Sequence, residues 1–167
     1  EFYFASEAKA LCPMVDDIKE FLPQHVYTST LGFQKYTPGV KESPDFDTPE
    51  QAARILAELL EQAIEKRMAD GVPEGVLLSG GLDSSIIACL AKEYRSDLKT
   101  FTVNLGDGED RECAREVARY LGTKHHEYTY TGGEITEALP QVIYYLESFE
   151  EDCVRGAVAN YFASRLA

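Results

Sequence analysis

Basic residues are scarce in this chain of 167 residues, which has 16 Lys and Arg against 29 Asp and Glu and a formal net charge of −13. Nucleic acids and anionic membranes are bound by clustered Lys and Arg, so we expect neither of them as a partner. An anionic ligand would have to be held by local backbone dipoles and a metal ion, because the overall electrostatic field of the chain repels it.

Long apolar runs and paired cysteines are absent as well. No stretch is long and apolar enough to span a membrane, and we expect no signal peptide. The four cysteines have no C-x-x-C spacing, so neither a zinc site nor a disulfide framework is indicated. Cys89 and Cys113 fall on expected apolar helix faces, where a reduced, buried thiol is the default. We therefore expect a cytoplasmic protein.

The most informative segment is an apolar run, Val76-Leu77-Leu78, followed by the motif S-G-G-x-D-S. Two glycines let a backbone approach a ligand closely, and serine hydroxyls together with the N–H groups of a helix start attract an anion. The single carboxylate of Asp83 suits a phosphate site when a cation bridges the two. The motif therefore predicts a pyrophosphate cradle over residues 79–85. The alternative, a plain strand-to-helix turn, explains Gly81 and Asp83 but leaves the three hydroxyls unexplained.

Elsewhere the pattern alternates between strands and helices, which is typical of an α/β fold with a parallel sheet and right-handed crossovers. We expect strands at 76–79, 99–105 and 125–130, and helices at 83–95, 110–121, 134–149 and from near Arg155. Pro140 should interrupt or bend the third of these helices. Ligands of such folds bind at the carboxyl ends of strands, so residues 79–85 and the segment after Val103 should share one crevice.

A further helix is expected before the sheet, from the N-cap Thr48 to Gly71, with Gln51 completing a capping box and an apolar stripe packed in the core. The first part of the chain is less regular. We expect a strand at 2–4, short helical segments at 7–11 and 16–21, and a hairpin formed by 25–30 and 33–36. Residues 37–45 are rich in turn formers and predict a linker.

Several segments together resemble a known family. The S-G-G-x-D-S loop is similar to the pyrophosphate-binding loop of N-type ATP pyrophosphatases. Further segments resemble glutamine-dependent asparagine synthetases in their order and spacing across nearly the whole chain. These segments are Phe4–Leu11, Val72–Ser85, Leu121–Glu127 and Val142–Glu147. The resemblance implies a parallel-sheet synthetase domain of the adenine nucleotide alpha hydrolase-like (PP-loop) type over 41–167, and the tail of an N-terminal glutaminase domain plus linker over 1–40.

The resemblance also implies an activity. Members of this family make asparagine from aspartate, ATP and glutamine or ammonia through a β-aspartyl-AMP intermediate, with release of pyrophosphate. ATP and Mg²⁺ would be bound, and Asp83 would be the catalytic and metal-holding carboxylate. Asp110 would lie near the metal, although the N-cap of the following helix is an equal alternative. The residues expected to contact the nucleotide are Leu77, Ser79, Gly80, Gly81, Leu82, Ser84, Ser85 and Val103.

Other interpretations stay open at this point. The chain could belong to another acyl-adenylating relative, such as a β-lactam synthetase type, or be a non-catalytic nucleotide-binding remnant. Arg155 matches a family position near the substrate, but a surface arginine is the competing explanation. His125 and His126 would point to opposite faces of a strand, which favours a partly buried pair over a metal site. The oligomeric state is also open, with a homodimer among the options.

The sequence lacks an initiator Met and stops inside an expected helix at Ala167, so we expect a piece of a longer protein. The N-terminal Cys nucleophile of the family's glutaminase domain is not found here, and Cys12 is not assigned its role. The family's second motif, S-G-E-G-x-D-E, would lie beyond Ala167.

Overall fold

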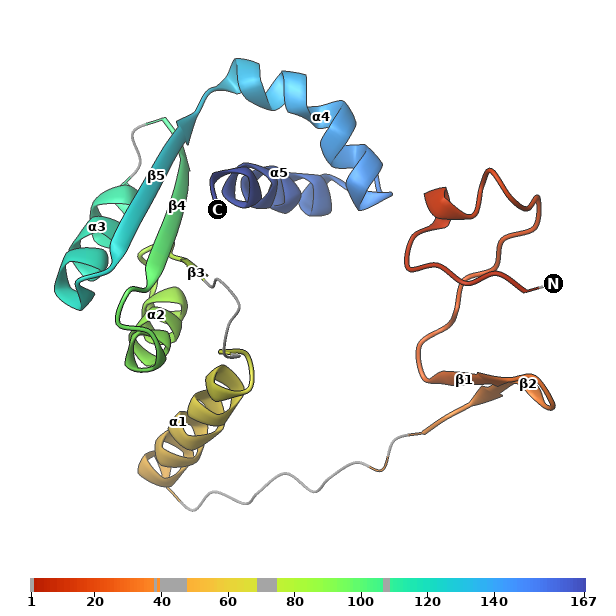
Figure 1. The fold of residues 1–167 in the computed structure, drawn as a ribbon, viewed down its shortest axis with the longest axis horizontal. Coiled ribbons are helices and arrows are strands. Elements are labelled where there is room, and N and C mark those ends of the chain that lie inside the picture. The colour runs from red at the N-terminus through yellow and green to blue at the C-terminus, as the bar shows by residue number, and fades with distance from the viewer. Residues whose placement is uncertain (1, 38, 40–47, 69–74, 107–108) are drawn as a thin grey trace. The chain divides into compact units, whose positions relative to one another are not determined.

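The computed structural model of the chain describes residues 2–37, 39, 48–68, 75–106 and 109–167 (Figure 1). The chain divides into two compact units, Glu1–Asp47 and Thr48–Ala167. Most of the predicted linker at 37–45 and the predicted helix end at Gly71 lie outside the described residues. None of the described helices combines the length and the apolar character that a membrane span requires.

The first unit contains the predicted hairpin. The strands β1 (His25–Thr28) and β2 (Gly32–Lys35) pair antiparallel, and the short helix η1 (Ala8–Ala10) is a single 3-10 turn. The expected strand at 2–4 and the helical turn at 16–21 are wrong, because neither segment has regular secondary structure. Aromatic side chains explain their apolar pattern instead. The rings of Phe2 and Phe4 lie 5.4 and 5.6 Å from that of Tyr27 on the hairpin.

The second unit is built on a parallel sheet, which confirms the predicted α/β fold. Its strands β3 (Gly75–Leu77), β4 (Lys99–Leu105) and β5 (Lys124–Tyr130) lie in the order β3-β4-β5. The crossover helices are α2 (Leu82–Tyr94) and α3 (Glu109–Leu121). Because β3 lies at the edge of the described sheet, Leu77 of the predicted first strand is 49% exposed, whereas Leu78 after it is buried.

Helices cover both faces of this sheet. On one face, Leu78 packs with Ala88 of α2 and with Ala114 and Ala118 of α3. On the other face, Tyr130 of β5 packs with residues of α4 (Gly132–Leu146) and α5 (Glu151–Leu166). Figure 1 shows α5 beside β4 and β5, away from α2 and α3. Side chains at successive positions of a strand point to opposite faces, so the two clusters form two layers around one sheet.

Helix α1 (Pro49–Glu65) begins as predicted, because the Thr48 hydroxyl accepts a hydrogen bond from the backbone N–H of Gln51 (3.3 Å). Ile64 near its end is buried against α2. The predicted core packing of the whole apolar stripe is wrong for Leu56 and Leu59, which are more than half exposed. Among the described residues, nothing covers this part of the helix.

Three predictions about helix faces and ends also need correction. Cys89 and Cys113 are exposed, because each is the direct neighbour of a buried alanine and therefore lies about 100° around the helix from it. Cys89 follows Ala88, and Cys113 precedes Ala114. Ile86 of α2 is exposed as well. Helix α4 begins two residues before the predicted start, because Thr131 and Glu134, on either side of two glycines, form a capping box. The helix is not interrupted at Pro140, and it ends at Leu146, three residues before the predicted end. Helix α5 begins at Glu151, four residues before Arg155.

Candidate functional site

The S-G-G-x-D-S motif forms the turn between β3 and α2, at the carboxyl end of the sheet. Parallel pairing continues one residue past β3, because the Leu78 N–H donates to the Phe101 carbonyl oxygen (2.8 Å). The buried Thr102 hydroxyl of β4 donates in turn to the Leu78 carbonyl oxygen. The residue that leads into the loop is thus fixed to the central strand from both sides.

Within the loop, two of the predicted serines meet. The oxygens of the Ser79 and Ser84 hydroxyls are 2.9 Å apart, and the Ser84 hydroxyl also accepts from the Ser79 backbone N–H (3.2 Å). The Gly81 N–H donates to the Ser79 hydroxyl (3.3 Å). The Ser85 hydroxyl instead turns back along the helix and donates to the Gly81 carbonyl oxygen (2.7 Å). The structure therefore brings Ser79, Gly81 and Ser84 together in a closed turn and directs Ser85 to the helix start.

Gly80 has a left-handed backbone conformation with a φ of +83°. A Cβ atom there would lie 2.6 Å from the Ala114 backbone nitrogen and 2.8 Å from both the Asp110 carbonyl oxygen and the Cys113 Cβ. Distances below 3 Å between such atoms are not tolerated, so only glycine fits between the loop and the first turns of α3. The loop is therefore packed against α3 with no space behind it.

The start of α2 offers backbone donors to an anion. The first intrahelical hydrogen bond runs from the Ser85 N–H to the Gly81 carbonyl oxygen (3.1 Å), so the N–H groups of residues 82–84 have no partner within the helix. Leu82 and Asp83 are exposed, which leaves this end of the helix accessible. Unpaired amides and the positive end of the helix dipole favour a bound phosphate here.

The remaining predicted site residues lie around the loop. Leu77 pairs with Phe101, so Leu77 and Val103 lie on the sheet face of α5, the first half-exposed and the second packed on the cluster of α4 and α5. Helix α3 begins at Glu109, so Asp110 lies in its first turn and the N-cap alternative is wrong. The Asp110 side chain is exposed.

Comparison with known proteins decides the family. A family profile described as asparagine synthase matches residues 55–167. The chain belongs to the asparagine synthase family. A glutamine-hydrolysing asparagine synthetase of Arabidopsis thaliana is 36% identical over 175 residues, which cover 98% of this chain and 30% of that protein. One of Zea mays is 37% identical over 175 residues, again 98% of this chain and 30% of that protein. The chain thus spans about 30% of the length of these asparagine synthetases.

Two further positions lie on or at the end of helices outside the loop: Arg155, which matches a family position, and Glu147, which ends the family-like segment Val142–Glu147. Arg155 is on the exposed side of α5, where its guanidinium is 3.9 Å from a Glu151 carboxylate oxygen and 4.0 Å from one of Asp152. This placement is that of a surface arginine. Glu147 is exposed and ends α4 in the left-handed conformation, with a φ of +53°.

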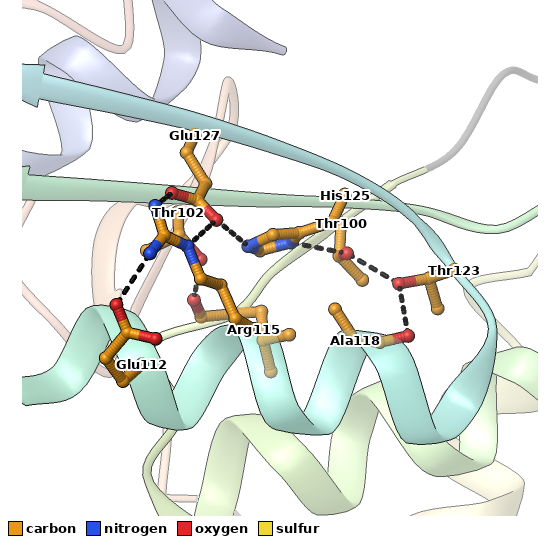
Figure 2. A network of polar contacts seen from close by, with 9 residues as sticks. Thr100, Thr102, Glu112, Arg115, Ala118, Thr123, His125 and Glu127 are labelled. Atoms are coloured by element: carbon orange, nitrogen blue, oxygen red, sulfur yellow. Dashed lines mark hydrogen bonds and ion pairs between the residues drawn. The ribbon is translucent and has the colours of Figure 1, made fainter.

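A polar network between α3 and the sheet was not predicted (Figure 2). Arg115 donates to both carboxylate oxygens of Glu127 on β5 (2.7 Å each) and to the Glu112 carboxylate (2.6 Å). Bidentate pairs of this kind are the stronger class of charged hydrogen bond. Hydrogen bonding from Arg115 lowers the pKa of Glu127 below its usual 4.5. The network fixes α3, which carries Asp110 and touches the loop, to the far strand of the described sheet.

His125 belongs to the same network and His126 does not. The Nδ1 atom of His125 lies 2.9 Å from the Thr100 hydroxyl, which is 2.8 Å from that of Thr123. His126 stacks on Phe101, with ring centroids 5.2 Å apart, on the opposite face. The prediction of a partly buried pair on opposite faces is confirmed. No group of three or more His, Cys, Asp and Glu side chains within the described parts of the chain is arranged to hold a metal ion.

We expect the stability of this unit to fall as the pH drops below about 6.5, because burial lowers the pKa of His125 below its usual 6.5. The unfolded chain then binds a proton that the folded chain excludes. The stabilisation is complete above pH 6.5, is lost as the pH falls through the folded-state pKa, and has a slope of at most about 1.4 kcal/mol per pH unit for one group. Protonation of Glu127, whose pKa is also lowered, should reduce the stability further below about pH 4.5.

Urea unfolding between about pH 5 and 7.5 measures this dependence. The variant His125→Gln should flatten it, whereas His126→Gln, which leaves the contact between Thr100 and His125 in place, should keep it. An unchanged slope in His125→Gln would contradict the assignment.

Proposed function

We propose that the protein synthesises asparagine from aspartate, ATP and ammonia derived from glutamine, through β-aspartyl-AMP and with release of pyrophosphate. One observation carries the proposal: the S-G-G-x-D-S turn is closed on itself at the accessible start of α2, in a chain of the asparagine synthase family. We assign ATP and pyrophosphate binding to this turn. We further propose that residues 1–40 are the tail of a glutaminase domain and its linker, and that 41–167 are the first part of the synthetase domain.

In this reaction the loop would need only to bind ATP and to stabilise the negative charge on the departing pyrophosphate. The β-carboxylate of aspartate attacks the α-phosphorus of ATP, the bond from that phosphorus to the bridging oxygen breaks, and pyrophosphate leaves with the negative charge. The backbone N–H groups of residues 82–84 would stabilise that charge without reorganising. The Ser79 and Ser84 hydroxyls, which contact each other, would add donors by turning toward the ligand. Leu77 and Val103 would border the adenine and ribose. Ammonia then displaces AMP from the acyl-adenylate.

The residues present also suit Mg²⁺. Magnesium is commonly bound by one or two carboxylates together with substrate phosphates, rather than by a cage of protein ligands. Asp83 at the start of α2 has an exposed side chain, and the Asp110 backbone lies against the loop at Gly80, so these two carboxylates would hold the ion. The ion would neutralise charge on the departing pyrophosphate. We propose small molecules as the partners and the cytoplasm as the location, with a homodimer as one option for assembly.

The test uses the intact protein with aspartate, ATP, Mg²⁺ and either glutamine or ammonia. Asparagine, AMP and pyrophosphate should form in equal amounts. Pyrophosphate release with a different amino acid and no asparagine would favour the β-lactam synthetase type. If calorimetry detects binding of neither ATP nor pyrophosphate to folded protein, the chain is a non-catalytic remnant and the proposal is overturned.

A further inference from the structure

Strand β4 carries three buried polar side chains at alternate positions, Thr100, Thr102 and Asn104, which are 0%, 3% and 9% exposed. Because these positions alternate, all three lie on the sheet face covered by α2 and α3. The Thr100 hydroxyl lies within hydrogen-bond distance of the Thr123 hydroxyl, and the Thr102 hydroxyl donates to the Leu78 carbonyl oxygen. The Nδ2 atom of Asn104 is buried and has no hydrogen-bond partner in the described structure.

An unpaired buried amide is unusual, because its lost hydrogen bonds to water are not replaced. The position of Asn104 in the fold gives a reason for its unpaired amide. Continuing the pairing of Leu77 with Phe101 by three residues places Gly80, at the turn, level with Asn104. Gly80 is also the residue packed against the first turns of α3. The unpaired donor therefore lies where the loop, the end of β4 and the start of α3 meet.

We propose that Asn104 is a further ligand-binding residue, whose side-chain amide donates a hydrogen bond to a phosphate oxygen of the bound pyrophosphate group. This inference rests on the proposed function of the loop. A neutral amide suits the task, because it can stay buried without a partner at far lower cost than a lysine or arginine. It would approach the ligand from β4, whereas the amides of residues 82–84 approach it from α2. Thr100 and Thr102 have partners within the protein and are not available for this role.

The test compares Asn104→Leu, which keeps the size of the side chain and removes the donor, with Thr129→Val as the matched control. Thr129 is the exposed register partner of Asn104 on β5. Binding of magnesium pyrophosphate and of ATP to the intact protein is measured by calorimetry. Pyrophosphate should bind about 10- to 100-fold more weakly to Asn104→Leu, as expected for one lost hydrogen bond to a charged group. Thr129→Val should bind it as the wild type does.

A thermal unfolding measurement without ligand separates binding from a structural role. Removing an unpaired buried donor should leave the unfolding temperature of Asn104→Leu unchanged or raise it. If Asn104→Leu does not fold, the same affinity and unfolding measurements are made on Asn104→Ala. Wild-type affinity in the folded variant overturns this inference alone, and so does weaker binding that comes with a lowered unfolding temperature. Failure of the wild-type protein to bind pyrophosphate overturns the proposed function as well.

Discussion

Replacing Gly80 with alanine is expected to weaken pyrophosphate binding by about 100-fold or more, because misplacing binding groups by about 1 Å has effects of this size. The new Cβ would lie 2.6 Å from the Ala114 nitrogen and 2.8 Å from the Asp110 carbonyl oxygen. Both atoms belong to a helix backbone and cannot rotate away, so the loop itself must move. The φ of +83° adds strain of about 1–2 kcal/mol.

Gly122→Ala is the matched control for this prediction. Gly122 has a φ of +62°, but a Cβ there would meet nothing within 4 Å. The control should therefore lose about 1–2 kcal/mol of stability from backbone strain and still bind pyrophosphate. Calorimetry and urea unfolding of both variants provide the comparison. Equal losses of affinity in the two variants would show that close packing of the loop on α3 is not what matters.

The second large effect is expected from Asp83→Asn, which should reduce asparagine synthesis by about 100- to 1,000-fold and abolish tight binding of magnesium ATP. Asp83 is exposed at the start of α2, and its carboxylate makes no hydrogen bond or ion pair in the described structure. The variant should stay folded, because it loses no hydrogen bond or ion pair and only the attraction between the carboxylate and the start of α2, about 0.3–1 kcal/mol. A large loss of function with at most a small loss of stability is the expected result.

Glu93→Gln removes a carboxylate from the other end of the same helix and serves as the control. Glu93 is exposed in the last turn of α2, far along the helix from the loop. This variant should synthesise asparagine at the wild-type rate. Full activity of Asp83→Asn in the presence of Mg²⁺, or equal losses in both variants, would remove Asp83 from the proposed site.

The elements that the sequence predicted well have local causes. The turn from β3 to α2 follows from two glycines and a helix-starting segment, and the hairpin at 25–35 from Leu31-Gly32 between two strand-forming runs. The parallel direction of the strands followed from the alternation of strands and helices, whereas their order in the sheet was not predicted. Each of these depends on residues close together in the chain.

The errors concern contacts between distant residues. Periodicity shows which positions share a face, but not whether anything covers that face, so Leu56 and Cys89 were predicted to be buried. Alternating threonines in β4 match the pattern of a solvated strand face. Thr100 and Thr102 are buried all the same, because Thr123 and His125 contact the Thr100 hydroxyl and the Leu78 carbonyl oxygen accepts from Thr102. Arg115 and Glu127, 12 residues apart, had no motif to connect them.

Gly80 leaves no gap between the turn and α3, and Arg115 holds that helix on β5. The turn is therefore backed by a helix that is held in place, and it could not move away from a bound diphosphate. Any adjustment to the size of the bound anion would have to come from the solvent-facing side of the turn, where Leu82 and Asp83 are exposed. In the proposed pyrophosphate site, selection among anions would thus be set by the fixed packing of the turn on α3 and by the mobility of the exposed side chains opposite it.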